Sequence, residues 1–467
     1  MSDQSQHNSS MNTTERRASF SLAGIFALRM LGLFMILPVI SIYGSEYQGF
    51  SPITVGLAIG IYGLTQALFQ IPFGLLSDRF GRKKILIIGL AIFAFGSAVS
   101  ALSGTMTGVI LGRALQGFGA ISAVILALTA DLTREEQRTK AMAIIGVSIG
   151  LAFALAMVLG PAITSVAGMP GLFWATGALA LGGIAVLLWY VPTPVITQFH
   201  RDTDPVFTQF SRILKDRQLL RLDLGILILH LIMTATFVAL PQVLRELGNF
   251  QASEHTRVYL LALPISVILM SPCIMYADRR NRVKHVYLAA IVLLALAQIS
   301  MSVFHQALWN VVLALIAYFT AFNILEASLP SLISRLAPAE LKGTALGAYA
   351  TAQNLGAFLG GVGGGWLMQH FGSYGVFTSC AVAAALWLLI ATGMRNPKAV
   401  STQLLKVGDL TEHEAATLGA TLLGIPGVDE AVVVAEDGIA YLKVDRKSLD
   451  REALMAYGLD SHEPQQA

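Results

Sequence analysis

The sequence has little cysteine and little charge. Its 467 residues include two cysteines, Cys273 and Cys380, which lie in apolar stretches without the paired spacing of a disulfide framework or a thiolate metal site. Charged residues make up 13% of the chain and hydrophobic residues 55%, whereas soluble proteins carry roughly 25% charged residues. This balance excludes a secreted, fibrous, disordered or nucleic-acid-binding protein as a description of the whole chain, and it indicates many membrane spans.

Motifs of enzymatic cofactors are absent as well. The sequence contains no Gly-rich phosphate loop that ends in Lys-Ser/Thr and no His/Cys set with metal-ligand spacing. Its 43 glycines favour close helix packing over phosphate binding. We therefore expect no enzymatic activity, no cofactor and no metal. The polar N-terminal stretch lacks a signal-peptide cleavage pattern, so the first apolar span is expected to stay uncleaved.

Long apolar runs dominate what the sequence does contain. A helix needs about 20 residues to cross the roughly 30 Å of hydrocarbon in a bilayer, and twelve runs of that length are bounded by charge, Gly or Pro. Because these runs are continuous and lack the alternation of barrel strands, they predict an all-α membrane protein. The predicted helices cover residues 19–43, 52–77, 84–103, 106–130, 139–166, 170–192, 221–245, 254–278, 284–304, 307–334, 342–368 and 373–394.

Lysine and arginine gather in alternate loops. The loops after the even-numbered spans hold most of them, whereas the loops on the other side hold only Arg245 and Arg257. By the positive-inside rule, both termini and the 193–220 connection are cytoplasmic, which predicts a multi-pass protein of a bacterial inner membrane.

The chain repeats itself at an interval of about 200 residues. Pro72–Arg79 at the end of the second span has a counterpart in Pro272–Arg279 at the end of the eighth, with Pro, Asp and Arg in register. Glu136–Met142 likewise recurs as Glu340–Leu346 before the eleventh span. These repeats predict two six-helix halves, the architecture of a transporter that rocks about a central site.

Three motifs resemble the major facilitator superfamily. Gly74–Lys84 is similar to that family's signature between the second and third spans, and Leu111–Ala120 is similar to the fourth-span motif of its proton-coupled members. Gly160-Pro161 resembles the antiporter motif of the drug:proton branch, although Ala162–Thr164 follow where Gly is expected. The resemblance covers about residues 16–396. It implies a proton-coupled transporter that works by alternating access and exports a small molecule.

The first motif implies a conformational latch. Gly74 is expected to let another helix approach closely. Asp78 is expected to accept hydrogen bonds from Arg82 and from the N-terminal amides of a neighbouring helix, with Asp131 as a second acceptor. Such a cluster would hold the two halves together in one state, the alternative being loop charges that only orient the chain. The predicted latch residues are Gly74, Asp78, Arg79, Gly81, Arg82 and Asp131.

Four ionisable residues lie deep in the predicted spans: Arg29, Arg113, His230 and Glu326. Each costs on the order of 3 kcal/mol to insert, so each should face the cavity between the halves or a polar partner. Glu326 is interpreted as the only acid well inside a span. Desolvation raises the pKa of such a carboxyl and a nearby Arg lowers it, which is the tuning that proton exchange needs. We predict that Glu326 exchanges the proton and that Arg113 is coupled to it or to substrate charge, with structural roles as the alternative.

Neutral polar side chains follow helical spacing in several spans. Tyr62, Gln66 and Gln70 lie at i, i+4 and i+8, and Tyr349 precedes Gln353 by one turn. Such stripes mark inward faces, which either touch substrate or bond other helices. The predicted cavity residues are Tyr62, Gln66, Gln70, Gln116, Asn323, Tyr349 and Gln353.

The end of the chain is different in composition. The last 70 residues carry 6 Lys/Arg against 12 Asp/Glu. The pattern predicts a strand at Gln403–Val407, followed by a helix that begins at a capping box of Thr411 and Glu414 and ends at about Leu423. It then predicts a hairpin around Asp437-Gly438, formed by Val428–Ala435 and Ile439–Val444. Ser448 is expected to cap a second helix. This order is typical of a ferredoxin-like module without its final strand.

The predicted module lacks cysteine and is acidic, so neither a thiolate metal site nor RNA binding is expected. Regulation, docking on the basic cytoplasmic loops and a passive stabilising role remain open for it. A drug-antiporter-like body that ends in such a module resembles one subgroup of the family. The predicted domains are a polar cytoplasmic tail (1–18), an N-terminal half (19–192), a linker (193–220), a C-terminal half (221–394) and the cytoplasmic ferredoxin-like domain (395–467).

The favoured function is therefore a proton-coupled efflux antiporter driven by the proton gradient. Two alternatives remain: an uptake symporter for a metabolite, and a transporter-like membrane sensor that signals through its C-terminal domain. Two arginines against one glutamate in the spans favour an anionic or zwitterionic substrate. The expected partners are the lipid bilayer, protons and a small-molecule substrate, with no nucleic acid, and the chain is expected to be a monomer.

Overall fold

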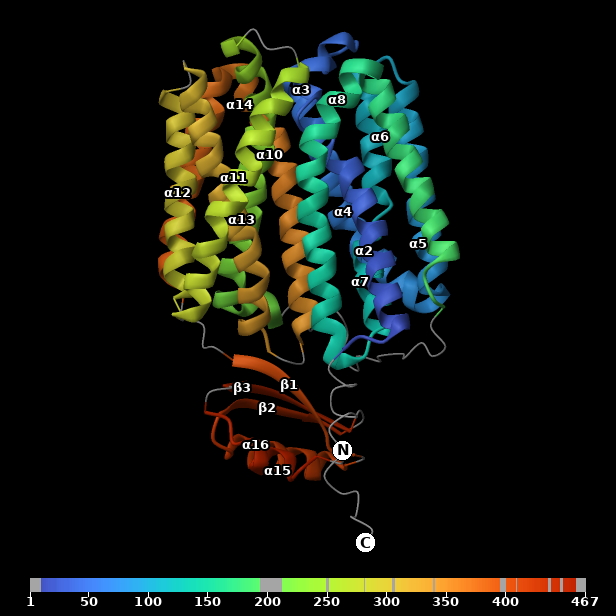
Figure 1. Ribbon diagram of the computed structural model, residues 1–467, viewed down its shortest axis with the longest axis vertical. Coiled ribbons are helices and arrows are strands. Elements are labelled where there is room, and N and C mark those ends of the chain that lie inside the picture. The colour runs from blue at the N-terminus through green and yellow to red at the C-terminus, as the bar shows by residue number, and fades with distance from the viewer. Residues whose placement is uncertain are drawn as a thin grey trace.

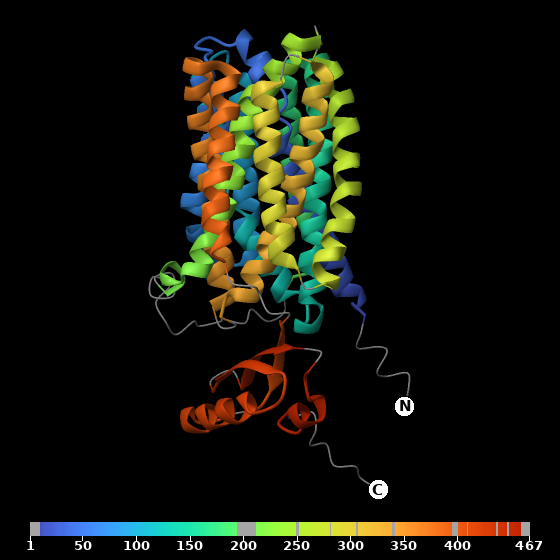
Figure 2. The same ribbon diagram turned by 90° about the vertical axis from the view of Figure 1, so that its left-hand side faces the viewer.

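The computed structural model describes residues 10–193, 212–248, 252–280, 282–304, 307–338, 341–394, 400–408, 410–435, 438–445 and 448–458. Long helices stand side by side in a bundle, and a small module with a sheet lies below one end of it (Figure 1). The perpendicular view shows the same separation between bundle and module (Figure 2). We call this end of the bundle the module end and the opposite end the far end.

The first half of the chain forms one side of the bundle and the second half the other (Figure 1). Helices of the first half are α2 (Thr13–Phe34), α3 (Ile40–Tyr43), the 3-10 helix η1 (Gly44–Glu46), α4 (Pro52–Phe80), α5 (Arg82–Leu102), α6 (Met106–Phe118), α7 (Ser122–Asp131) and α8 (Glu135–Trp189). Helices of the second half are α10 (Arg217–Gly248), α11 (Ala252–Arg279), α12 (Val283–Val303), α13 (Leu308–Leu336) and α14 (Lys342–Thr392).

The twelve predicted spans are confirmed. Ten helical segments in the described ranges are long and apolar enough to cross a bilayer, and two of these, Lys140–Trp189 and Gly343–Thr392, are 50 residues long. Each long segment contains one non-helical glycine, Gly168 with φ 63° or Gly372 with φ 62°, which divides it into two spans. Only glycine adopts such a conformation without strain. The two glycines lie 204 residues apart, the same interval as the repeat of Glu136 at Glu340.

Two predicted spans are broken where continuous helices were expected. The first, 19–43, consists of α2 and α3 with non-helical residues between them. The fourth, 106–130, is interrupted between Phe118 and Ser122, and this break leaves the Gly119 carbonyl free to accept a hydrogen bond from Arg29 Nη2 at 3.3 Å. Irregular backbone inside a membrane is tolerated where protein groups satisfy it, which is the case here.

At the far end, the two halves are in direct contact through the backbones of α4 and α14. A Cβ on Gly56 of α4 would overlap the Gly361 carbonyl of α14, and a Cβ on Gly60 would lie 2.8 Å from the Phe358 carbonyl. Ser41 of α3 also donates to the Val238 carbonyl of α10 at 2.9 Å. Since backbones approach this closely only without side chains between them, the glycines close this end of the bundle. We call the contact of Gly56 and Gly60 with Phe358 and Gly361 the glycine seam.

The C-terminal module is a three-stranded antiparallel sheet with two helices. It consists of β1 (Val400–Lys406), α15 (Glu412–Leu423), β2 (Val428–Val434), β3 (Ile439–Asp445) and α16 (Arg451–Met455), with strand order β1-β3-β2. Buried Leu405, Leu422, Leu442 and Leu454 join the sheet and both helices in one core. The predicted order of elements is confirmed for the part of the chain that the structure describes.

The two helix caps of the module had different outcomes. The capping box of Thr411 and Glu414 is confirmed, with Thr411 N donating to Glu414 Oε2 at 2.8 Å. Ser448 is wrong as the second cap, because Asp450 accepts from Ala453 N at 3.1 Å. The Asp450 amide donates to the Pro426 carbonyl at 3.0 Å, which ties this residue to the turn before β2 and starts the helix later.

Three predicted features lie outside the described residues: most of the linker (194–211), Asp437 of the hairpin turn, and the side chain of Asp278 in the second repeat.

A bulky side chain at Gly361 should open the far end. Gly361→Leu would place its side chain against Gly56 and Gly60, whereas Gly363, two residues away on α14, has no neighbouring atom within 4 Å of an added Cβ. With Ser41→Cys as a reporter and Cys273 and Cys380 replaced by Ser, we expect Gly361→Leu to raise the rate of labelling by a water-soluble maleimide at least about tenfold, which corresponds to about 1.4 kcal/mol. Gly363→Leu is the control, and equal rates in both variants would contradict a closed glycine seam.

Candidate functional site

Three polar side chains of the second half meet in the middle of the bundle. The Gln353 amide nitrogen of α14 lies 2.8 Å from His230 Nε2 of α10 and donates to Glu326 Oε1 of α13 at 3.3 Å. His230 Nε2 and Glu326 Oε2 are 4.0 Å apart. An amide NH2 group only donates, so His230 accepts at Nε2 and is neutral in this arrangement. We call Glu326, His230 and Gln353 the central triad.

An aromatic wall lies beside the central triad on the side of the far end. Phe153 of α8, in the first half, packs against Phe237, Phe319 and Phe322 of the second half, with ring centroids 6.3, 6.1 and 6.2 Å apart. Phe322 also lies 6.0 Å from the His230 ring. The Glu326 side chain remains 37% exposed. The wall and the glycine seam both lie between the central triad and the far end.

The first half contains two buried guanidinium groups. Arg29 donates to Ser122 Oγ at 2.9 Å and to Gln66 Oε1 at 3.0 Å. Arg113 donates to the Ala58 carbonyl at 3.2 Å and to Gln116 Oε1 at 2.8 Å. These acceptors are all neutral, so the charges are stabilised by hydrogen bonds and dipoles.

The ring of Tyr62 lies beside both guanidinium groups. The Cζ atom of Arg29 is 5.7 Å from the ring centroid and that of Arg113 is 5.0 Å from it. Both distances suit a cation–π interaction, which is strongest where water is excluded. Arg29 and Arg113 are at most 1% exposed. The first half thus holds two positive charges in a closed network.

The structure does not bring Arg113 and Glu326 together. The contacts given above place Arg113 on residues of the first half, whereas Glu326 contacts Gln353 and His230 of the second half. The predicted coupling between them therefore does not operate by direct contact in this conformation. That Arg113 responds to proton or substrate charge stays a prediction.

The predicted cavity residues divide into two groups. Tyr62, Gln66, Gln70 and Gln116 are at most 5% exposed and belong to the arginine network or lie beside it. Gln353 belongs to the central triad, and Tyr349 lies one helical turn before it. Asn323 donates to Ser266 Oγ of α11 at 3.1 Å and so joins two helices. For Gln66, Gln116 and Asn323, periodicity identified the inward face, and the structure fills that face with hydrogen bonds between helices.

A charge cluster lies at the module end of the first half. Arg82 at the start of α5 forms an ion pair with Asp78 of α4 and with Asp131 of α7, the latter at 3.0 Å. Arg82 also donates to Ser77 Oγ at 2.8 Å. Gly81, with φ 99°, makes the turn that places Arg82 there. We call Asp78, Arg82 and Asp131 the charge cluster.

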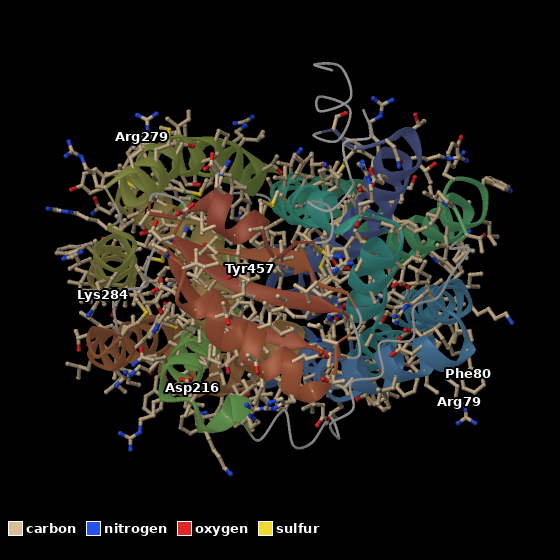
Figure 3. The ribbon with its side chains drawn as sticks, turned by 90° about the horizontal axis from the view of Figure 1, so that it is seen from below. Arg79, Phe80, Asp216, Arg279, Lys284 and Tyr457 are labelled. Carbon is tan, nitrogen blue, oxygen red and sulfur yellow. The ribbon has the colours of Figure 1, made fainter. Side chains whose placement is uncertain are left out.

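Arg79 and Gly74, two other predicted latch residues of this motif, do not take part in the charge cluster. Arg79 is exposed and lies at the rim beside Phe80 (Figure 3). An added Cβ on Gly74 would meet Ala123 Cβ at 3.9 Å, an ordinary contact, so the close approach expected at Gly74 is wrong for this conformation. The charge cluster joins three helices of the first half. That it holds the two halves together stays a prediction.

Sequence reasoning missed one buried acid. Asp223 of α10 is 5% exposed, and neither carboxylate oxygen has a hydrogen-bond partner among the described residues. The interpretation of Glu326 as the only acid well inside a span is therefore wrong. Asp223 stands three residues into the predicted span 221–245, but α10 begins at Arg217. Counting the span from Arg217 would have revealed it.

A second missed contact is an ion pair at the start of the chain. Glu15, in the first turn of α2, is 3% exposed and accepts from Arg134 Nε at 2.8 Å and from the Arg134 backbone amide at 2.9 Å. The predicted polar tail 1–18 therefore includes the first turn and a half of α2. This pair ties the start of α2 to the residue that precedes α8.

Comparisons with known proteins agree with this architecture. The family model "Major Facilitator Superfamily" matches residues 22–360 and 222–418. The chain is 47% identical to the inner membrane transport protein YajR of Escherichia coli (strain K12) over 94% of this chain and 97% of that protein. It is 24% identical to the multidrug resistance protein MdtH of Klebsiella pneumoniae (strain 342) over 73% of this chain and 84% of that protein.

Among solved structures, the crystal structure of a D-xylose–proton symporter matches with a TM-score of 0.65 at 17% identity, covering 82% of this chain and 98% of that chain. At this identity the match shows the fold alone. The family match and the similarity to YajR confirm the resemblance that the motifs indicate. The chain belongs to the major facilitator superfamily and is a membrane transporter of that family.

Proposed function

We propose that this transporter is proton-coupled, that it exports a small molecule by alternating access, and that Glu326 exchanges the proton. The observation that carries the proposal is the Glu326 carboxyl in the central triad, whose Oε2 atom is buried without a hydrogen-bond partner among the described residues. A carboxyl at such depth is costly unless it has a function or a partner. Its contacts in the described part of the chain, Gln353 and the neutral His230, tolerate both the charged and the neutral carboxyl.

The closed far end supports alternating access. The glycine seam and the aromatic wall separate Glu326 from the far end. Rocking of the halves that separates Gly56 from Gly361 would expose the triad to the other side. A proton taken up on one side would then be released on the other.

Export is the favoured direction. Gly160 of the antiporter-like motif lets α8 pack on the Met35 carbonyl, where the chain breaks between α2 and α3. The similarity to a multidrug resistance protein points the same way. The sign of substrate-dependent proton movement in inverted vesicles tests the direction, because an uptake symporter would move protons with its substrate and not against it.

The proposed location is a bacterial inner membrane with both termini in the cytoplasm. YajR carries "inner membrane" in its name. The loops that contain Arg79 and Lys284 lie at the same end of the bundle as the C-terminal module (Figure 3). Clustered positive charge at that end fits the cytoplasmic side. The proposed transporter acts as a monomer, with the proton gradient as its energy source and no cofactor.

Glu326→Gln should uncouple transport from protons. The amide keeps the shape and accepts from Gln353, but it cannot ionise. After a thermal-shift screen has identified a ligand, we expect ligand binding to persist while transport driven by a pH gradient falls roughly 100-fold. Glu46→Gln, an exposed acid at the far end, is the matched control. Full proton-driven transport by Glu326→Gln would exclude Glu326 as the exchanging group.

The charge cluster should stabilise the module end of the first half. Arg82 is 14% and Asp131 is 15% exposed, so Arg82→Gln leaves two carboxylates without their cation. We expect a loss of about 1.5–3 kcal/mol in the free energy of unfolding, the contribution of a hydrogen bond to a charged group. Thermal melting in lipid nanodiscs measures this loss. Arg79→Gln, which removes an exposed charge from the same motif, should change stability by less than about 0.5 kcal/mol. Equal melting of the two variants would show that the cluster has no such role.

A further inference from the structure

His255, in the first turn of α11, is a buried histidine that the proposed mechanism does not use. Its side chain is completely covered, and neither ring nitrogen has a hydrogen-bond partner among the described residues. Buried polar groups are almost always hydrogen-bonded, so a covered ring with two unpartnered nitrogens needs a physical explanation. Since α10 runs from the module end to the far end, α11 begins at the far end, and His255 lies there (Figure 1).

His255 lies one helical turn beyond the aromatic wall. Tyr259 follows it by four residues on the same face of α11, about 6 Å closer to the middle of the bundle. Tyr259 is buried, and its ring centroid lies 6.5 Å from that of Phe237 in the wall. Phe237 packs in turn on Phe153 of the first half. The cover over His255 is therefore continuous with the contacts that close the far end.

The helices packed against α11 bring little charge to this place. α11 packs against α8 of the first half and against α10, α12 and α13 of the second. Arg245 and Glu246 at the end of α10 are both exposed. Arg245 is near enough to His255 to repel a positive ring. The far-end stretches of the other three helices contain no ionisable residue: Gly160–Thr176, Ala297–Val303 and Leu308–Ile316.

α11 itself adds no counter-charge among its described side chains. Arg257 is exposed, and Tyr259 is a neutral phenol without a hydrogen-bond partner in the described set. The side chain of Glu254 lies outside the described residues. None of the ion pairs found in the described ranges involves His255.

A proton on His255 is therefore costly while the far end is closed. A protonated imidazole carries a charge and donates at both nitrogens, and neither nitrogen has an acceptor here. Moving such a charge out of water costs several kcal/mol, whereas the neutral ring costs much less. In water, an imidazole binds its proton below about pH 6.5. A conformation in which water reaches His255 thus binds the proton more tightly than the closed one.

We propose that His255 is a proton-binding site at the far end of the transporter, and that its protonation opens this end. The open conformation binds more protons at this site than the closed one, so acid favours the open conformation and alkali the closed one. In the proposed orientation, the far end would open toward the side from which the gradient supplies protons. The inference goes beyond the proposed function, because it requires no proton exchange at Glu326.

A distance measurement across the far end tests the proposal without a substrate. Ser45 of η1 and Ala307 before α13 are exposed and belong to different halves. Spin labels on Ser45→Cys and Ala307→Cys, with Cys273 and Cys380 replaced by serine, report the ratio of open to closed conformations by pulsed EPR in lipid nanodiscs. For one proton bound near pH 6.5 in water, we expect this ratio to rise about tenfold from about pH 7.5 to about pH 5.5. A ratio that does not rise would overturn the proposal, and this measurement needs no variant of His255.

Replacement of single ionisable residues in this labelled protein then assigns the response. We expect His255→Gln to give a ratio that does not depend on pH, and His255→Phe, which keeps a neutral ring, serves the same purpose if the glutamine variant does not fold. His370→Gln is the matched control, because His370 is an exposed histidine at the far end of α14. It should keep the tenfold rise.

Glu326→Gln separates this proposal from the proposed function. We expect the variant to keep the rise of the open-to-closed ratio in acid, whatever its effect on proton-driven transport. A rise that survives in both His255 variants would overturn the proposal, as would a rise that is lost in Glu326→Gln. Intact proton-driven transport by Glu326→Gln would contradict only the proposed function and leave the His255 site standing.

Discussion

The cost of burying charge in an apolar bundle shapes both halves of this transporter. The first half meets that cost with neutral acceptors: Arg29 and Arg113 are almost completely buried, and glutamine, serine and carbonyl oxygens hold them beside Tyr62. Even the break in the fourth span serves this purpose, because it frees the Gly119 carbonyl for Arg29. Neither guanidinium can lose its proton under ordinary conditions, so this half keeps a fixed charge.

The second half meets the same cost differently. Its ionisable groups inside the bundle include carboxyls and the buried histidines His230 and His255, which can become neutral by gaining or losing a proton. Glu326 has two neutral partners and Asp223 has none among the described residues. The arginine network of the first half keeps a fixed charge, whereas Glu326, His230 and Asp223 of the second half can change theirs, and this division is the physical basis of the proposed proton coupling.

Hydropathy and repeats predicted the fold well. The spans follow from the length of apolar runs, and the division into halves follows from motifs that recur at the interval of Gly168 and Gly372. The site was predicted less completely. Periodicity placed Gln66 and Gln116 on inward faces, but it cannot say that the neighbouring group is an arginine of the same half. Asp223 was missed because the start of its span was set too late, and the helix cap at Asp450 depends on a contact with the distant Pro426.

The two kinds of contact that close the far end have different consequences for motion. The glycine seam between α4 and α14 is backbone against backbone, and it separates without any side chain having to change rotamer. The aromatic wall is made of rings from both halves, so opening it exposes apolar surface around Phe153, which water disfavours. A substrate or proton shifts the balance between conformations only if it binds one of them more tightly. Since Phe322 of the wall also packs on His230, a group that binds to the central triad in the proposed mechanism would act directly on the wall.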